Sequence, residues 1–106
     1  MRFPKEETRR IRQAVWARSL DRCEVCGAWL GAHGGELDHH QSRRVPQAVS
    51  NTWRLCTPCH RLRTDNAPSA AHWCRIIIEF CERYGYTIEA ERAGARLQSL
   101  AAKGMA

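Results

Sequence analysis

Two Cys-x-x-Cys units constrain this chain more than any other feature of its sequence. The first unit contains Cys23 and Cys26, and the second contains Cys56 and Cys59. Together they supply four thiolates, which is the ligand set of a structural zinc ion with tetrahedral coordination and no open position. Four buried free cysteines are the alternative, and the paired spacing argues against it. The sequence therefore predicts a four-cysteine site for Zn²⁺.

The insert between the two units is long enough to fold. It has 29 residues, more than a simple zinc ribbon needs, and it contains Asp38, His39, His40 and Asn51. These residue types bind divalent ions or carry protons in enzymes. We therefore expect a folded segment between the two units that carries these polar side chains.

Length and composition indicate one folded unit in the cytoplasm. A chain of 106 residues fits a single domain over residues 1–106, without room for a second independent core. No apolar run approaches the roughly 20 residues that a membrane span needs, and charged residues stand where a secretory signal would be apolar. We expect a cytoplasmic protein without a membrane partner. In the reducing cytoplasm, paired Cys-x-x-Cys units more often bind metal than form disulfides.

The positive charge is concentrated in the first part of the chain. The net charge is +6, and residues 1–64 carry 12 Lys and Arg against 6 Asp and Glu, whereas residues 65–106 carry 5 of each. Clustered arginine favours a polyanion because its planar guanidinium donates two hydrogen bonds to one phosphate. A solvated basic face is the alternative that charge alone leaves open.

Hydrophobic spacing predicts an amphipathic helix over residues 8–20 and two short strands at residues 36–40 and 52–55. The strands would form a hairpin with a long polar connection. The apolar positions of the helix are Ile11, Ala14, Val15 and Leu20, and its basic positions are Arg9, Arg10, Arg12 and Arg18.

Helices are also expected in the second half of the chain. Thr57 and Pro58 form a helix start, so Cys59 and His60 would lie in the first turn. A second helix is expected over residues 69–84, with Gly85 as its end and with Cys74 and Cys81 as core thiols. Residues 86–88 are expected to form a short strand, and residues 89–103 a last helix.

Over residues 9–65 the sequence resembles the HNH endonucleases of the zinc-knuckle type. The resemblance is carried by Asp38-His39, then Asn51, then His60 directly after Cys59, in the order of the HNH motif and set between the two Cys-x-x-Cys units. It implies an α+β fold with a small ββα-metal core, also called a His-Me finger, that holds one divalent cation. A basic N-terminal helix and a helical extension over residues 66–106 would flank this core.

The resemblance also implies roles for these residues in a metal-dependent DNA endonuclease of a bacterium or phage. Asp38 and His60 would bind the catalytic ion, which would be Mg²⁺ or Mn²⁺, with Ni²⁺ or Zn²⁺ as alternatives. His39 would be the general base, because a neutral histidine accepts a proton from water near pH 7. Asn51 would fix the hairpin. The DNA contacts are expected from Arg9, Arg10, Arg12, Arg43 and Arg44.

Several alternatives remain open at this point. In a shifted register His39 would be the ligand and His40 the base, and His60 would in another case belong to the zinc knuckle. The loop after His40 lacks the glycine pair common in the family. A nonenzymatic zinc module that binds nucleic acid or a protein partner is the second hypothesis for function. The chain is expected to be a monomer or a weak homodimer, since one active site cuts one strand.

Overall fold

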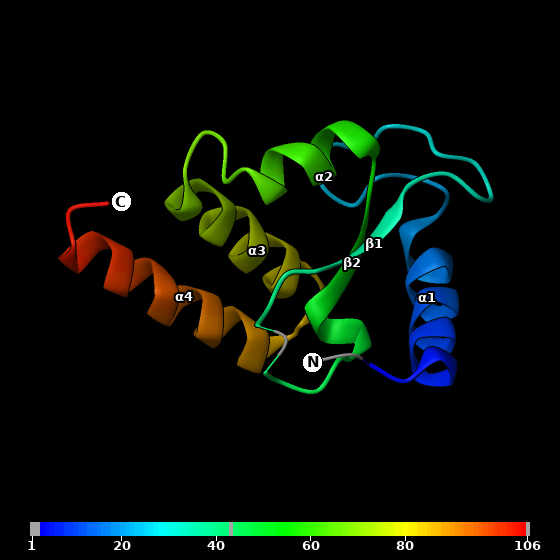
Figure 1. Ribbon diagram of the computed structural model, residues 1–106, viewed down its shortest axis with the longest axis horizontal. Helices are drawn as coiled ribbons and strands as arrows, with labels where there is room; N and C mark the ends of the chain where they lie inside the picture. The colour runs from blue at the N-terminus through cyan, green and yellow to red at the C-terminus, as the bar shows by residue number, and fades with distance from the viewer. Residues whose placement is uncertain (1–2, 43, 106) are drawn as a thin grey trace. The chain divides into compact units, whose positions relative to one another are not determined.

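The computed structural model describes residues 3–42 and 44–105 and has two compact units, Met1–His60 and Arg61–Ala106. The first unit contains the helix α1 (Lys5–Ser19), the strand β1 (Glu36–His39), the short 3-10 helix η1 (Val49–Asn51) and the strand β2 (Thr52–Leu55) (Figure 1). The fold is of the α+β class. No helix in the described part of the chain is long and apolar enough to cross a membrane.

The helix α1 begins one turn earlier than the sequence predicted. The carbonyl of Pro4 accepts hydrogen bonds from the backbone N–H and the hydroxyl of Thr8, which closes that first turn. Glu6 and Glu7 lie in this turn, where carboxylates are favourable beside the positive end of the helix dipole. The helix ends before Leu20, which has a left-handed backbone conformation with φ of 52°.

The strands β1 and β2 form the antiparallel hairpin that the sequence predicted, with Glu36 paired to Leu55 and His39 paired to Thr52. All four residues of β2 are buried. The loop between the strands is closed by Asn51, which accepts from the backbone N–H of Ala48 and donates to the carbonyl of Pro46, both at 2.9 Å. The start of β2 is therefore fixed to the loop that precedes it.

A buried carboxylate connects α1, the first Cys-x-x-Cys unit and β2. Glu24 lies inside that unit, and its two oxygens accept from Nε and Nη2 of Arg18, each at 2.7 Å. Oε1 of Glu24 also accepts from the backbone N–H of Arg54 at 2.9 Å. Only 2% of the Glu24 side chain and 9% of the Arg18 side chain are exposed. Arg18, one of the basic positions of the predicted amphipathic helix, is therefore largely buried in an ion pair.

Arg54 is a second buried cation in the same unit, with no exposed surface. Its guanidinium donates to the carbonyls of Gly31 and Gly34 and to the hydroxyl of Ser19. It also lies 4.5 Å from the ring centroid of Trp16 on α1. Because these partners belong to separate segments, Arg54 fixes the loop after the first Cys-x-x-Cys unit to α1 and β2.

The helix α2 (Thr57–Thr64) begins at the predicted position, and the boundary between the two units falls within it, after His60. In the second unit, α3 (Ala70–Tyr84) packs against α4 (Thr87–Ala102) around a small core. Ser69 caps α3 by accepting from the backbone N–H of His72, and Gly85 ends it with φ of 73°. One core cluster of this unit consists of Ala71, Cys74 and Leu100, with Ala70 and Leu97 packed against it.

Two expectations for this second unit have different outcomes. Cys74 and Cys81 are buried, with 2% and 0% of their surface exposed, as predicted for core thiols. The short strand expected at residues 86–88 is absent from the described chain, because α4 already begins at Thr87. Tyr86 instead lies in an aromatic cluster with Phe80 and Tyr84, and these ring contacts hold the turn between the two helices.

Replacing Glu24 by alanine should destabilise the protein strongly. The change leaves the buried guanidinium of Arg18 without its carboxylate, so we expect the free energy of unfolding to fall by about 3–5 kcal/mol. Urea denaturation of the zinc-loaded chain, followed by tryptophan fluorescence, measures this. Glu79→Ala is the control, because Glu79 is exposed in the middle of α3, and it should change the stability by less than about 0.5 kcal/mol. Equal effects of the two substitutions would contradict a stabilising role for the buried pair of Arg18 and Glu24.

Candidate metal centre and neighbouring polar site

The four predicted zinc ligands come together. The Sγ atoms of Cys23, Cys26, Cys56 and Cys59 lie within 4.8 Å of one another, and those of Cys26 and Cys56 are 3.7 Å apart. Four sulfurs at about 2.3 Å from a tetrahedral zinc ion are separated by about 3.8 Å. The cluster therefore has the dimensions to hold a metal ion such as zinc. It is the one group of three or more potential ligands of this kind within residues 3–42 and 44–105.

The surroundings of the thiols favour charge on some of them and oppose it on others. Burial opposes ionisation of Cys23, but backbone N–H groups of Cys26, Cys56 and Val25 donate to it and lower its pKa. Burial raises the pKa of Cys59 well above its usual range, and the neighbouring thiols raise it further. Four thiolates are thus compatible in this volume only when a cation balances their charge.

A second polar cluster forms where β1 faces the first turn of α2. Nε2 of His60 lies 3.6 Å from Oδ1 of Asp38, and Nδ1 of His60 lies 3.0 Å from Oε2 of Glu36. The other oxygen of Asp38 accepts from the indole N–H of Trp53 at 2.8 Å. Asp38 and Trp53 are directly paired across the hairpin. The fold therefore brings the predicted ligands Asp38 and His60 together and orients each by a further hydrogen bond.

The spacing of Oδ1 of Asp38 and Nε2 of His60 is suitable for binding one cation. Two ligand atoms at about 2.1 Å lie roughly 3.4 Å apart around a tetrahedral ion and roughly 3.0 Å apart around an octahedral ion such as Mg²⁺. The two atoms are 3.6 Å apart here, so they would move closer together on binding. Glu36 faces the opposite nitrogen of the His60 ring, so these two residues cannot bind the same ion through adjacent atoms. About a third of the His60 side chain is exposed, which leaves room for water.

His39 lies away from this cluster, because neighbouring side chains of a strand point to opposite faces. Its Nε2 atom is 2.9 Å from Oε1 of Gln47, and its ring stacks on that of Phe3 with a centroid distance of 5.2 Å. The sequence predicted that Asp38 and His39 would serve separate roles, and the two side chains do have separate partners.

A chain of hydrogen bonds favours one tautomer of the His39 ring. The carbonyl of Pro4 can only accept, so the hydroxyl of Thr8 donates its single proton there, at 3.1 Å. The Thr8 oxygen then accepts from Nε2 of Gln47 at 2.8 Å. Oε1 of Gln47 is left to accept from Nε2 of His39. The neutral His39 ring therefore carries its proton on Nε2 and its lone pair on Nδ1.

His40, the alternative base, is in a different environment. Only 7% of its surface is exposed, and its ring packs edge-on against Trp53 at a centroid distance of 4.9 Å. A general base must reach a water molecule or a substrate proton. The burial of His40 therefore favours His39 for that role.

The arginines of α1 that were predicted to contact DNA have different surroundings. Arg10 is exposed. Arg9 forms an exposed ion pair with Glu6, and the guanidinium of Arg12 lies 5.0 Å from the ring centroid of Trp16. The structure therefore leaves at least three cations of α1 at the surface.

The two remaining arginines of that set belong to the loop after β1. Arg44 is exposed there, and its backbone N–H donates to the hydroxyl of Ser42 at 3.2 Å. Arg43 lies outside the described residues. The loop therefore adds one described cation to those of α1.

Sequence reasoning missed three residues of this site, which are Glu36, Gln47 and Trp53. Glu36 had a detectable signal, because it lies two positions before Asp38 and so on the same face of a strand. Trp53 is the cross-strand partner of Asp38, which follows once the register is known. Gln47 had no local signal, since its contacts depend on the loop conformation.

Comparison with family models, with curated proteins and with solved structures finds no match for this chain.

The cysteine cluster should hold about one tightly bound zinc ion per chain. We expect Cys56→Ser to lose this zinc and to unfold the first unit, because zinc binding in such sites contributes about 10–16 kcal/mol. Mass spectrometry of the metal content and circular dichroism measure the two effects. Cys74→Ala is the matched control, since this thiol is buried in α3, and it should keep its zinc. A folded Cys56→Ser protein with full zinc content would contradict the site.

Proposed function

We propose that this chain is a metal-dependent DNA endonuclease of the HNH type that hydrolyses phosphodiester bonds. The observation that supports it best is the pair of Oδ1 of Asp38 and Nε2 of His60, 3.6 Å apart at the junction of β1 and α2. Both are among the positions that the resemblance to HNH nucleases assigns to a catalytic cation. The neighbouring residue His39 supplies a base on the other side of the strand.

Each residue of the pair would bind a divalent cation through one atom while a second atom is held by the protein. Trp53 holds the far oxygen of Asp38, and Glu36 holds the far nitrogen of His60. Such outer hydrogen bonds fix the orientation and the tautomer of metal ligands. A bound Mg²⁺ or Mn²⁺ would supply Lewis-acid stabilisation of the phosphoryl and leaving oxygens.

His39 would take the proton of the attacking water on Nδ1. Gln47 accepts the Nε2–H of the ring, so the lone pair of Nδ1 points away from Gln47. The same hydrogen bond opposes a flip of the ring. Phe3 covers one face of the imidazole, which restricts the ring further. Gln47 and Phe3 therefore orient the His39 ring, as a general base needs to be oriented for efficient proton transfer.

The competing hypothesis is a nonenzymatic zinc module, and one observation favours it. A protonated His60 would bridge the carboxylates of Glu36 and Asp38 as a closed ionic cluster, with no need for a cation. In that case the cluster would only stabilise the junction of β1 and α2. Zinc-loaded protein that fails to nick supercoiled plasmid with Mg²⁺, Mn²⁺ or Ni²⁺ would support the module.

Replacing His39 by alanine should reduce the nicking rate by about 10²–10⁴-fold, the typical cost of losing a general base. Zinc content and the melting temperature should change little, since the backbone of β1 is kept. His33→Ala is the control, because His33 is exposed in the turn before β1, and it should cleave at the unsubstituted rate. Gel analysis of plasmid nicking measures both. Loss of cleavage in His40→Ala, with full cleavage in His39→Ala, would assign the role of general base to His40 instead of His39.

Glu36→Ala should weaken the binding of Mn²⁺ by about 10–100-fold, because His60 loses the acceptor that orients it. Glu36→Gln keeps a neutral acceptor at the same place, so its Mn²⁺ affinity should lie near that of the unsubstituted protein. Electron paramagnetic resonance titration of the zinc-loaded chain measures the affinity without requiring cleavage. Equal affinities for Glu36→Ala and the unsubstituted protein would exclude a positioning role for Glu36.

A further inference from the structure

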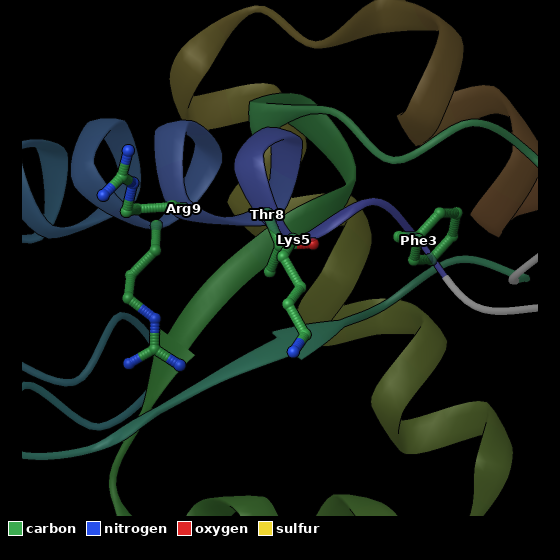
Figure 2. A pocket seen from close by; sticks show the side chains of 5 residues that line it. Phe3, Lys5, Thr8 and Arg9 are labelled. Atoms are coloured by element: carbon green, nitrogen blue, oxygen red, sulfur yellow. The ribbon is translucent and has the colours of Figure 1, made fainter.

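The start of α1 forms a hollow with a volume of about 360 Å³, lined by Phe3, Lys5, Thr8, Arg9 and Arg12 (Figure 2). We call it the α1 hollow. Lys5, Arg9 and Arg12 are spaced by four and three residues, so they share one side of the helix. None of the described residues that line the hollow is acidic. Three cationic side chains therefore border the hollow on one side of the helix.

These cations are available to a ligand. The side chains of Arg9 and Glu6 are 66% and 67% exposed, and an ion pair exposed to this extent is weak and is screened by salt. The guanidinium carbon of Arg12 lies 5.0 Å from the ring centroid of Trp16, and Arg12 is exposed. The buried cation Arg18 of the same helix, by contrast, has a carboxylate partner in Glu24.

The α1 hollow adjoins the surroundings of His39. Phe3 stacks on the His39 ring, and Thr8 contacts Gln47, which in turn contacts His39. From Lys5 to Arg12 the helix rises by about 10 Å, which matches the axial rise of about three nucleotides of one DNA strand at 3.4 Å each. A strand that lay along Lys5, Arg9 and Arg12 would thus pass directly beside His39.

We propose that the α1 hollow binds successive phosphates of one DNA strand next to the phosphate that is cut. This inference depends on the proposed function for the identity of the ligand, but it replaces a diffuse basic face by a defined set of contacts. The proposed phosphate contacts of α1 include Lys5 and exclude Arg10. Arginine donates two hydrogen bonds to a phosphate, and the ammonium of Lys5 adds a point charge.

The test compares Arg9→Ala/Arg12→Ala with Arg10→Ala by fluorescence anisotropy of a short labelled DNA duplex. The full zinc-loaded chain is used without any added divalent ion, so binding is measured apart from cleavage. Each lost phosphate contact should lower the slope of log affinity against log salt by about 0.9. We expect a decrease of roughly 1.8 for the double variant and no change for Arg10→Ala.

Further arms make the result decisive. Arg9→Gln/Arg12→Gln keeps most of the side-chain length, so a matching loss of slope would assign the effect to charge rather than to altered packing. An Arg10→Ala slope as low as that of the double variant, or an absence of DNA binding by the unsubstituted chain, would overturn the proposal. So would competition by polyglutamate as strong as that by unlabelled DNA. DNA binding through the hollow without plasmid nicking would contradict only the nuclease assignment.

Discussion

The structure of the first unit depends on the buried carboxylate of Glu24. In the sequence Glu24 lies between Cys23 and Cys26, two of the candidate zinc ligands. Its carboxylate accepts hydrogen bonds from the guanidinium of Arg18 in α1 and from the backbone N–H of Arg54 in β2. A charge buried to this extent is tolerated only with full pairing, so the three segments are held in one arrangement. The position of the first knuckle then fixes that of the hairpin, and the hairpin fixes Asp38. On the opposite side His60 follows Cys59 directly, so a metal held by the cysteines would also position His60.

Much of this arrangement could be predicted from the sequence because its signals are local. The paired cysteines indicate a metal site by their spacing alone, and alternation with turn residues indicates the hairpin. Ser69 and Gly85 mark the ends of α3 by the chemistry of helix caps. Asp38, His60 and their proximity followed from a resemblance rather than from spacing, and the structure brings the two side chains within 3.6 Å.

The remaining features could not be predicted because they depend on contacts between distant positions. Arg18 belongs to a helix rich in exposed arginine, and only the fold reveals its partner Glu24. Thr8 and Gln47 are 39 residues apart, so their hydrogen bond has no sequence pattern. The start of α4 was missed for another reason, because the β-branched residues Thr87 and Ile88 favour a strand locally and helix packing overrides that preference.

The hydrogen-bond chain from Pro4 to His39 has a consequence for which substitutions this sequence tolerates. Thr8 gives the chain its direction, because its single proton is committed to the Pro4 carbonyl. Serine at position 8 would preserve that direction, whereas valine, nearly identical in shape, would let the Gln47 amide turn over and the two tautomers of His39 interchange. A surface position of a helix thus carries an evolutionary constraint that neither its exposure nor its helix propensity reveals, and positions 8 and 47 should vary together among descendants of this chain.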